Sequence, residues 1–143
     1  MSNETLFSIC NTAILPGWLL LVALPRWKWT ARLVTAVIIP ALLGLVYLFL
    51  ILTEFGKTEG GFGSLAQVQQ LFANPAMVVA GWIHYLAFDL FIGSWEVRDA
   101  QRLGLSHWLV IPCLVLTFLF GPIGLLLYFA LRAALKKQFV LGE

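Results

Sequence analysis

The chain has 143 residues, of which 61% are hydrophobic and only 11% are charged, with a formal net charge of +2. Its mean hydropathy is +0.92. Soluble domains are about half apolar and about a quarter charged, so this composition excludes a soluble domain and indicates membrane lipid as the surroundings. The small net charge, with no basic stripe, excludes nucleic acid as a partner. We expect residues 1–143 to form a single polytopic membrane domain.

Four stretches are apolar over the roughly 20 residues that a helix needs to cross the hydrocarbon core. They are residues 5–24, 31–52, 76–96 and 108–131. No strand-like alternation is present, and a backbone in lipid must satisfy its own hydrogen bonds, so the pattern predicts an all-α, four-helix transmembrane bundle. Four crossings would place both termini on one face, named side A here, with side B opposite.

The N-terminal sequence MSNETLF has no Lys or Arg, and no small-residue cleavage motif follows the first apolar run. We therefore expect a retained first span rather than a cleaved signal peptide. Basic residues do not decide the orientation, because four fall on side A and five on side B. Those on side A are Lys57, Arg132, Lys136 and Lys137, and those on side B are Arg26, Lys28, Arg32, Arg98 and Arg102.

A short interfacial helix is predicted between the second and third spans. Ser64 followed by Gln67 has the form of a capping box, and apolar residues then recur on one helical face up to Phe72. Asn74 and Pro75 supply a cap and a first-turn proline for the third span.

Pro16, Pro40 and Pro122 lie near the middle of the first, second and fourth spans. Each proline removes a backbone donor and bends its helix. Broken helices around a midplane site are one way to build a pocket inside a membrane. We therefore expect proline-kinked helices around a site at this depth.

The third span carries His84 and Asp89 near its centre. An ionised Asp there costs about 2.5–3.5 kcal/mol on insertion scales, so Asp89 should face the bundle interior and serve a purpose. At 100° per residue, Asp89 shares a face with Tyr85 and Glu96, whereas His84 points about 140° away, beside Phe88.

Structural interpretations remain open beside the functional one. His84 could bond to a neighbouring helix, Asp89 could form an ion pair, and Glu96 with Asp99 could be a solvated helix end. The chain has two histidines, too few for a di-iron centre or a bis-histidine haem. We therefore expect no metal and no cofactor.

The segment WIHYLAFDLF, the later Asp99 and the GPIG of the last span closely resemble the family named for abscisic-acid-deficient-four, whose plant members are associated with neoxanthin synthesis. The matching residues are Trp82, Ile83, His84, Asp89, Leu90, Phe91, Asp99, Pro122 and Gly124. The resemblance covers most of the chain and is strongest between residues 75 and 132.

The resemblance implies a protein that acts on a carotenoid or related isoprenoid in the bilayer. In the plant reaction the epoxide of violaxanthin opens and a nearby proton is lost, which is an isomerisation. Asp89 would be the acid, and His84 the base or a group that holds the substrate oxygen. We expect the substrate to contact the remaining polar and aromatic residues of the site, which are Asn11, Trp82, Tyr85, Phe88, Glu96 and Asp99.

Three functions therefore compete: a carotenoid (xanthophyll) isomerase, a non-catalytic carotenoid- or lipid-binding protein, and a small ion or proton carrier that uses Asp89 and His84. Few polar residues lie outside the third span, which disfavours the carrier. The expected partners are membrane lipid and an isoprenoid ligand, with a homo-oligomer or pigment–protein complex as a further assembly. Since no transit extension is evident, the expected location is a bacterial inner or photosynthetic membrane.

Overall fold

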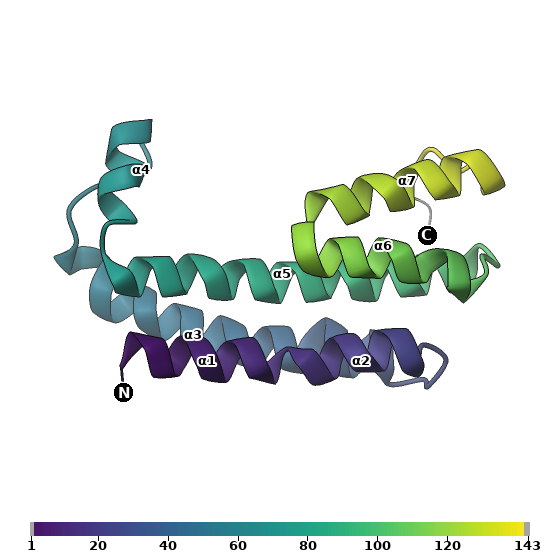
Figure 1. Cartoon of the computed structure of the whole chain (residues 1–143), viewed down its shortest axis with the longest axis horizontal. Helices are drawn as coiled ribbons and strands as arrows, with labels where there is room; N and C mark the ends of the chain where they lie inside the picture. The colour runs from purple at the N-terminus through teal and green to yellow at the C-terminus, as the bar shows by residue number, and fades with distance from the viewer. Residues whose placement is uncertain (1, 142–143) are drawn as a thin grey trace.

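The computed structural model describes residues 2–141, and within that range the regular elements are helices (Figure 1). They are α1 (Asn3–Ala13), α2 (Leu15–Ala23), the π-helix η1 (Thr30–Ile38), α3 (Ile39–Glu54), the 3₁₀ turn η2 (Phe55–Lys57), α4 (Leu65–Leu71), α5 (Pro75–Arg102), α6 (His107–Phe120) and α7 (Pro122–Lys136).

Three continuous helical segments are long and apolar enough to cross a membrane: Asn3–Ala23, Thr30–Lys57 and Pro75–Arg102. Large apolar side chains cover their outer surfaces, as at Leu19 and Leu52, which are 68% and 75% exposed. Such a surface suits lipid and not water. The first three predicted spans therefore have the expected length and composition.

The fourth predicted span is wrong, because residues 108–131 do not form one helix. α6 ends at Phe120 and α7 begins at Pro122, and the two pack together as an antiparallel hairpin. Gly121 between them has a φ of 39°, a conformation that favours glycine, and Pro122 has no N–H with which to continue α6. Gly-Pro therefore reverses the chain where the apolar pattern alone predicts a continuous helix.

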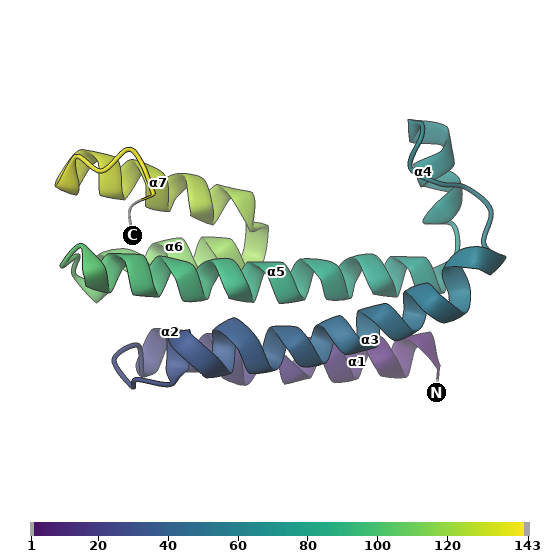
Figure 2. The same cartoon turned by 180° about the vertical axis from the view of Figure 1, so that it is seen from behind.

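The hairpin also overturns the expected position of the C-terminus. α7 runs back from Gly121, which lies against Asp89, to Arg132, which pairs with Asp99 near the end of α5. The last described residues therefore lie at the side-B end, opposite the start of α1 (Figures 1 and 2). The molecule is thus three long helical segments plus a half-length hairpin, and the four-helix bundle is not confirmed.

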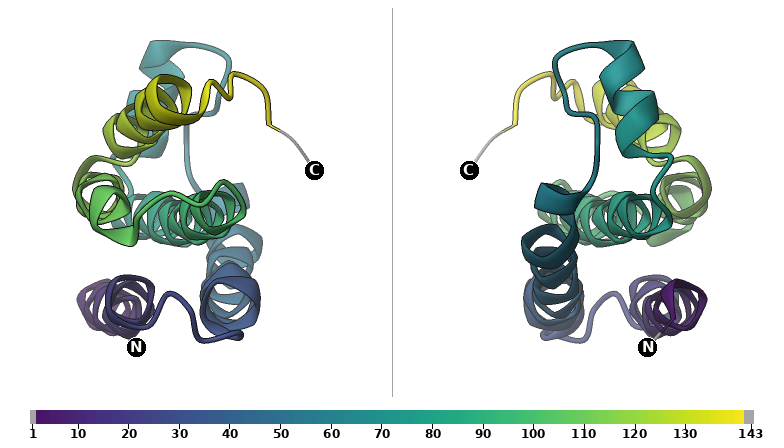
Figure 3. Two further views of the ribbon diagram at one scale, coloured as in Figure 1. Left: turned by 90° about the vertical axis from the view of Figure 1, so that its right-hand side faces the viewer. Right: turned by 90° about the vertical axis from the view of Figure 1, so that its left-hand side faces the viewer.

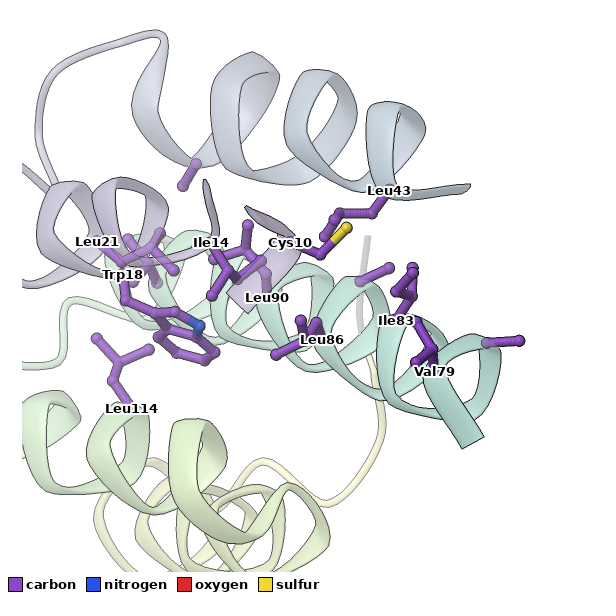
Figure 4. Close-up of a cluster of buried hydrophobic side chains, with 14 of the residues drawn as sticks. Cys10, Ile14, Trp18, Leu21, Leu43, Val79, Ile83, Leu86, Leu90 and Leu114 are labelled. Atoms are coloured by element: carbon purple, nitrogen blue, oxygen red, sulfur yellow. The ribbon is translucent and has the colours of Figure 1, made fainter. Parts of the chain in front are cut away.

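α5 is the central helix. It contacts α1, α2, η1, α3, α6 and α7, and in the end-on views it lies between the α1–α3 layer and the hairpin (Figure 3). The core around it is apolar, with Ile14, Leu90 and Leu114 fully buried beside Trp18 (Figure 4).

Prolines interrupt the other helices where the sequence predicts. Pro16 lies in the first turn of α2, just after the break at Ile14. Before Pro40 the helix adopts the wider π register, in which the Ile39 N–H donates to the Val34 carbonyl. Helix α4 is confirmed as well, since the Ser64 Oγ accepts from the Gln67 N–H at 3.3 Å.

Candidate functional site

Asp89 lies on α5 where the tip of the α6–α7 hairpin meets it. A Cβ added to Gly121 would lie 2.8 Å from the Asp89 Oδ1, so the tip approaches the carboxyl group as closely as a glycine allows. The Asp89 Oδ2 is buried and has no hydrogen-bond partner among the described residues. Most buried polar atoms have a partner, so an unpaired one calls for an explanation; the Arg132 Nε is the other such atom among the described residues.

An aromatic series leads from side A towards Asp89. The ring centroids of Phe7 and Trp82 are 5.6 Å apart, and those of Trp82 and Tyr85 are 5.1 Å apart. The Trp82 Nε1 donates to the Asn11 Oδ1 at 3.2 Å, and the Tyr85 hydroxyl donates to the Phe118 carbonyl at 2.9 Å. Asn11 of α1 therefore holds Trp82, and the Phe118 carbonyl near the hairpin tip holds Tyr85, so that these three predicted binding residues lie together on the Asp89 side of α5.

Glu96 is fully buried on the same face of α5, about two turns beyond Asp89. The Thr117 hydroxyl lies 3.0 Å and 3.2 Å from its two carboxyl oxygens and donates to them. Thr117 can approach because Gly124 has no side chain, and a Cβ there would lie 2.1 Å from the Thr117 Oγ1. The second glycine of GPIG thus positions the partner of Glu96.

Asp99 is held by three side chains. The Tyr128 hydroxyl donates to its Oδ2 at 2.7 Å, the Arg132 Nε lies 3.2 Å from the same oxygen, and the Arg102 guanidinium donates to Oδ1 at 2.7 Å. Arg132 is only 1% exposed and its guanidinium also lies 5.8 Å from the centre of the Trp95 ring. Glu96 and Asp99 are therefore buried in the hairpin interface, and the solvated-helix-end interpretation is wrong.

His84 and Phe88 lie on the other face of α5. The two rings stack with centroids 4.5 Å apart, and His84 lies 5.8 Å from the Tyr47 ring of α3. His84 also lines a pocket of about 300 Å³ beneath α4. The structure therefore does not bring His84 and Asp89 together, since one contacts α3 and the other contacts the hairpin tip.

Thr117, Gly121, Tyr128 and Arg132 surround the carboxyl groups of α5, yet the sequence analysis did not predict them as site residues. Thr117, Gly121 and Tyr128 lie in the last apolar stretch, and Arg132 is the first cation after it. No group of three or more metal-ligating side chains occurs among residues 2–141, which gives no candidate metal site in that range.

The profile described as ABA DEFICIENT 4-like matches residues 5–128, which is most of the chain. The chain belongs to the ABA DEFICIENT 4-like family. The match includes Asp89, Glu96, Asp99 and the Gly121 tip, whereas Arg132 lies beyond it.

One similar relative is the protein ABA DEFICIENT 4, chloroplastic, of Arabidopsis thaliana. It is 24% identical over 145 residues, covering 95% of this chain. The chain spans 64% of the length of that relative. No solved structure matches the chain.

Proposed function

We propose that the chain is a multi-pass membrane protein that binds a carotenoid or related isoprenoid in the bilayer and isomerises it at Asp89. Membership of the ABA DEFICIENT 4-like family and the apolar outer surface support the class of ligand. The observation that carries the proposal is the unpaired Oδ2 of Asp89, buried at the hairpin tip.

The aromatic series on this face suits a flat conjugated chain. Phe7, Trp82 and Tyr85 are successive ring neighbours, so a polyene along them would contact ring faces and edges. Its end would then reach Asp89 beside the Tyr85 hydroxyl. In this proposal Asn11, Trp82 and Tyr85 position the ligand and Asp89 carries the chemistry.

One carboxyl group can complete the isomerisation of a carotenoid epoxide. The Asp89 carboxylic acid protonates the epoxide oxygen as the C–O bond breaks, which leaves a carboxylate. The carboxylate then removes a proton from the neighbouring polyene carbon, whose electrons form the allene. One proton is given and one is recovered, and no electrons are transferred. His84, on the other face of α5, takes no part in this scheme.

The first prediction concerns Asp89→Asn. An amide neither donates the required proton nor recovers it, so we expect product to fall by about 10²–10⁴-fold. Thermal stability in detergent should change little, because the unpaired oxygen loses no partner. The measurement is chromatography of pigments from a carotenoid-epoxide-producing host that expresses each variant.

Glu54→Gln is the matched control, since it makes the same chemical change in a carboxylate that pairs with Lys57 at the side-A end. It should leave the product unchanged. Unaltered product from Asp89→Asn would contradict the proposal. Pigment that co-purifies with the wild type without any product would instead favour the non-catalytic binding protein.

A further inference from the structure

The face of α5 opposite Asp89 carries a pocket that the proposed reaction leaves unused. It lies between α3, α4 and α5, has a volume of about 300 Å³ and is lined mainly by apolar and aromatic side chains. Among them are Phe55 and Phe72, with Gly81 at one side. A Cβ on Gly81 would lie 2.7 Å from the Phe72 ring, so the glycine gives that ring its place in the wall.

His84 and Tyr47 are the two residues lining this apolar pocket that carry a polar side-chain group, and His84 is exposed at its edge. Their contacts with each other and with Phe88 are ring contacts, and neither polar group hydrogen-bonds to a described residue. An unpaired polar group in hydrocarbon costs free energy unless a ligand supplies its partner. The pocket therefore fits a ring that carries at least one oxygen.

A second cavity, called the groove here, lies further along the same face of α5 and shares no lining residue with the pocket. His84 stacks on Phe88, and Phe88 lines this cavity of about 290 Å³ with Pro40, Gly44 and Phe91. Pocket and groove together extend over about 14 residues of α5, or about 21 Å at 1.5 Å per residue. A Cβ on Gly44 would meet no atom within 4 Å, so the groove has room for a chain with side methyl groups.

We propose that this α3–α5 face is a second binding site, which holds the oxygen-bearing ring of an isoprenoid lipid against His84 and Tyr47, with the isoprenoid chain along Phe88. The ring follows from the pocket, whereas the isoprenoid nature of the chain rests on the proposed function. A hydroxylated carotenoid ring and a quinone head group share this chemistry. Neutral imidazole has one donor and one acceptor, so it can bond to a hydroxyl or to a carbonyl.

The test measures ligand binding to the full chain in nanodiscs. The probes are zeaxanthin, which has a hydroxyl on each ring, its oxygen-free counterpart β-carotene, and a short-chain ubiquinone. We expect zeaxanthin or the quinone to bind at least about tenfold more tightly than a probe without oxygen, because only they satisfy His84. The tighter of the two identifies the source of the ring.

Two variants locate the site. The double variant His84→Phe and Tyr47→Phe keeps two rings of similar size, so β-carotene affinity should persist while the preference for oxygen-bearing probes disappears. Gly44→Phe fills the groove and should weaken all probes about tenfold, whereas Leu52→Phe adds bulk at a lipid-facing position of α3 outside both cavities and should weaken none. Circular dichroism and thermal unfolding establish that each variant is folded.

A preference that survives the double variant His84→Phe and Tyr47→Phe, equal losses in Gly44→Phe and Leu52→Phe, or no binding of either oxygen-bearing probe would overturn the proposal. Asp89→Asn distinguishes the second binding site from the proposed reaction site, since Asp89 lies on the opposite face of α5. The variant should lose product while its preference among the probes persists. Loss of the preference in Asp89→Asn would place the binding at Asp89 and would also contradict the second site.

Discussion

Asp89, Glu96 and Asp99 are three carboxyl groups on one helix, and their surroundings differ. Asp89 has a buried oxygen without a partner, Glu96 has Thr117, and Asp99 has two hydrogen-bond donors, Tyr128 and Arg102, and an ion pair with Arg132. The cost of a charge in lipid identifies Asp89 as unusual from sequence alone, whereas the sequence leaves Glu96 and Asp99 open as a solvated helix end. The partner Arg132 could not be predicted, because it returns to the end of α5 only after the chain reverses at Gly121.

At the residue scale we predict that Asp99→Asn destabilises the protein strongly. The change removes the countercharge from Arg132, which is 1% exposed, and breaking a buried pair costs about 3–5 kcal/mol. Unfolding in detergent measures the loss. Tyr128→Phe is the control, since it removes one hydrogen bond and should cost only about 1–2 kcal/mol. Equal losses in the two variants would contradict a buried ion pair.

The elements of this protein begin and end largely where local signals indicate. Ser64 and Asn74 cap α4 and α5 as the sequence predicts, and Pro16, which is expected to bend the first span, lies in the first turn of α2. The hairpin is the exception. Residues 108–131 have the composition of a span, and hydropathy does not distinguish one crossing from two half-length helices. The decisive signal is local, because Gly121 precedes a proline and can adopt a positive φ.

At the element scale we predict that Gly121→Ala opens the hairpin. Alanine at a φ of 39° is strained by about 1–3 kcal/mol, and its Cβ would crowd Asp89. Cys113 of α6 is fully buried. In a background with Cys10 replaced by Ala, a thiol reagent should therefore label Cys113 faster in Gly121→Ala than in the parent chain. Gly56→Ala, at an open position with ordinary φ, should leave the rate unchanged. An unchanged rate in Gly121→Ala would show that the tip tolerates a side chain.

The reversal of the chain at Gly121 changes which end of the molecule carries the basic residues of α7. With α7 returning to the side-B end, Arg132 pairs with Asp99, and the Lys136 Nζ would lie 3.9 Å from a Cβ on Gly104. Of nine Lys and Arg residues, eight then belong to side B and only Lys57 to side A. The four-span prediction divides the same residues almost equally, so the wrong topology concealed a strong bias.

At the whole-molecule scale we predict that side B faces the cytoplasm, following the positive-inside rule. In a chain whose native cysteines are replaced, Asn3→Cys should react with an impermeant reagent from outside and Val140→Cys only after permeabilisation. Labelling of both positions from one face would contradict the hairpin. Labelling from opposite faces in the reverse sense would retain the hairpin and contradict the orientation.

Because the hairpin is only half as long as the other helical segments, the molecule has a larger cross-section at its side-B end than at its side-A end. Near side B the hairpin of α6 and α7 packs beside α5, and α6 also contacts α2. Near side A the hairpin is absent and α4 stands apart from the three long segments (Figure 1). In a bilayer such a body is a wedge, and it displaces more lipid from one leaflet than from the other. Lipids with bulky head groups in the side-A leaflet would match this taper, so membrane curvature and leaflet composition should bear on where the protein resides.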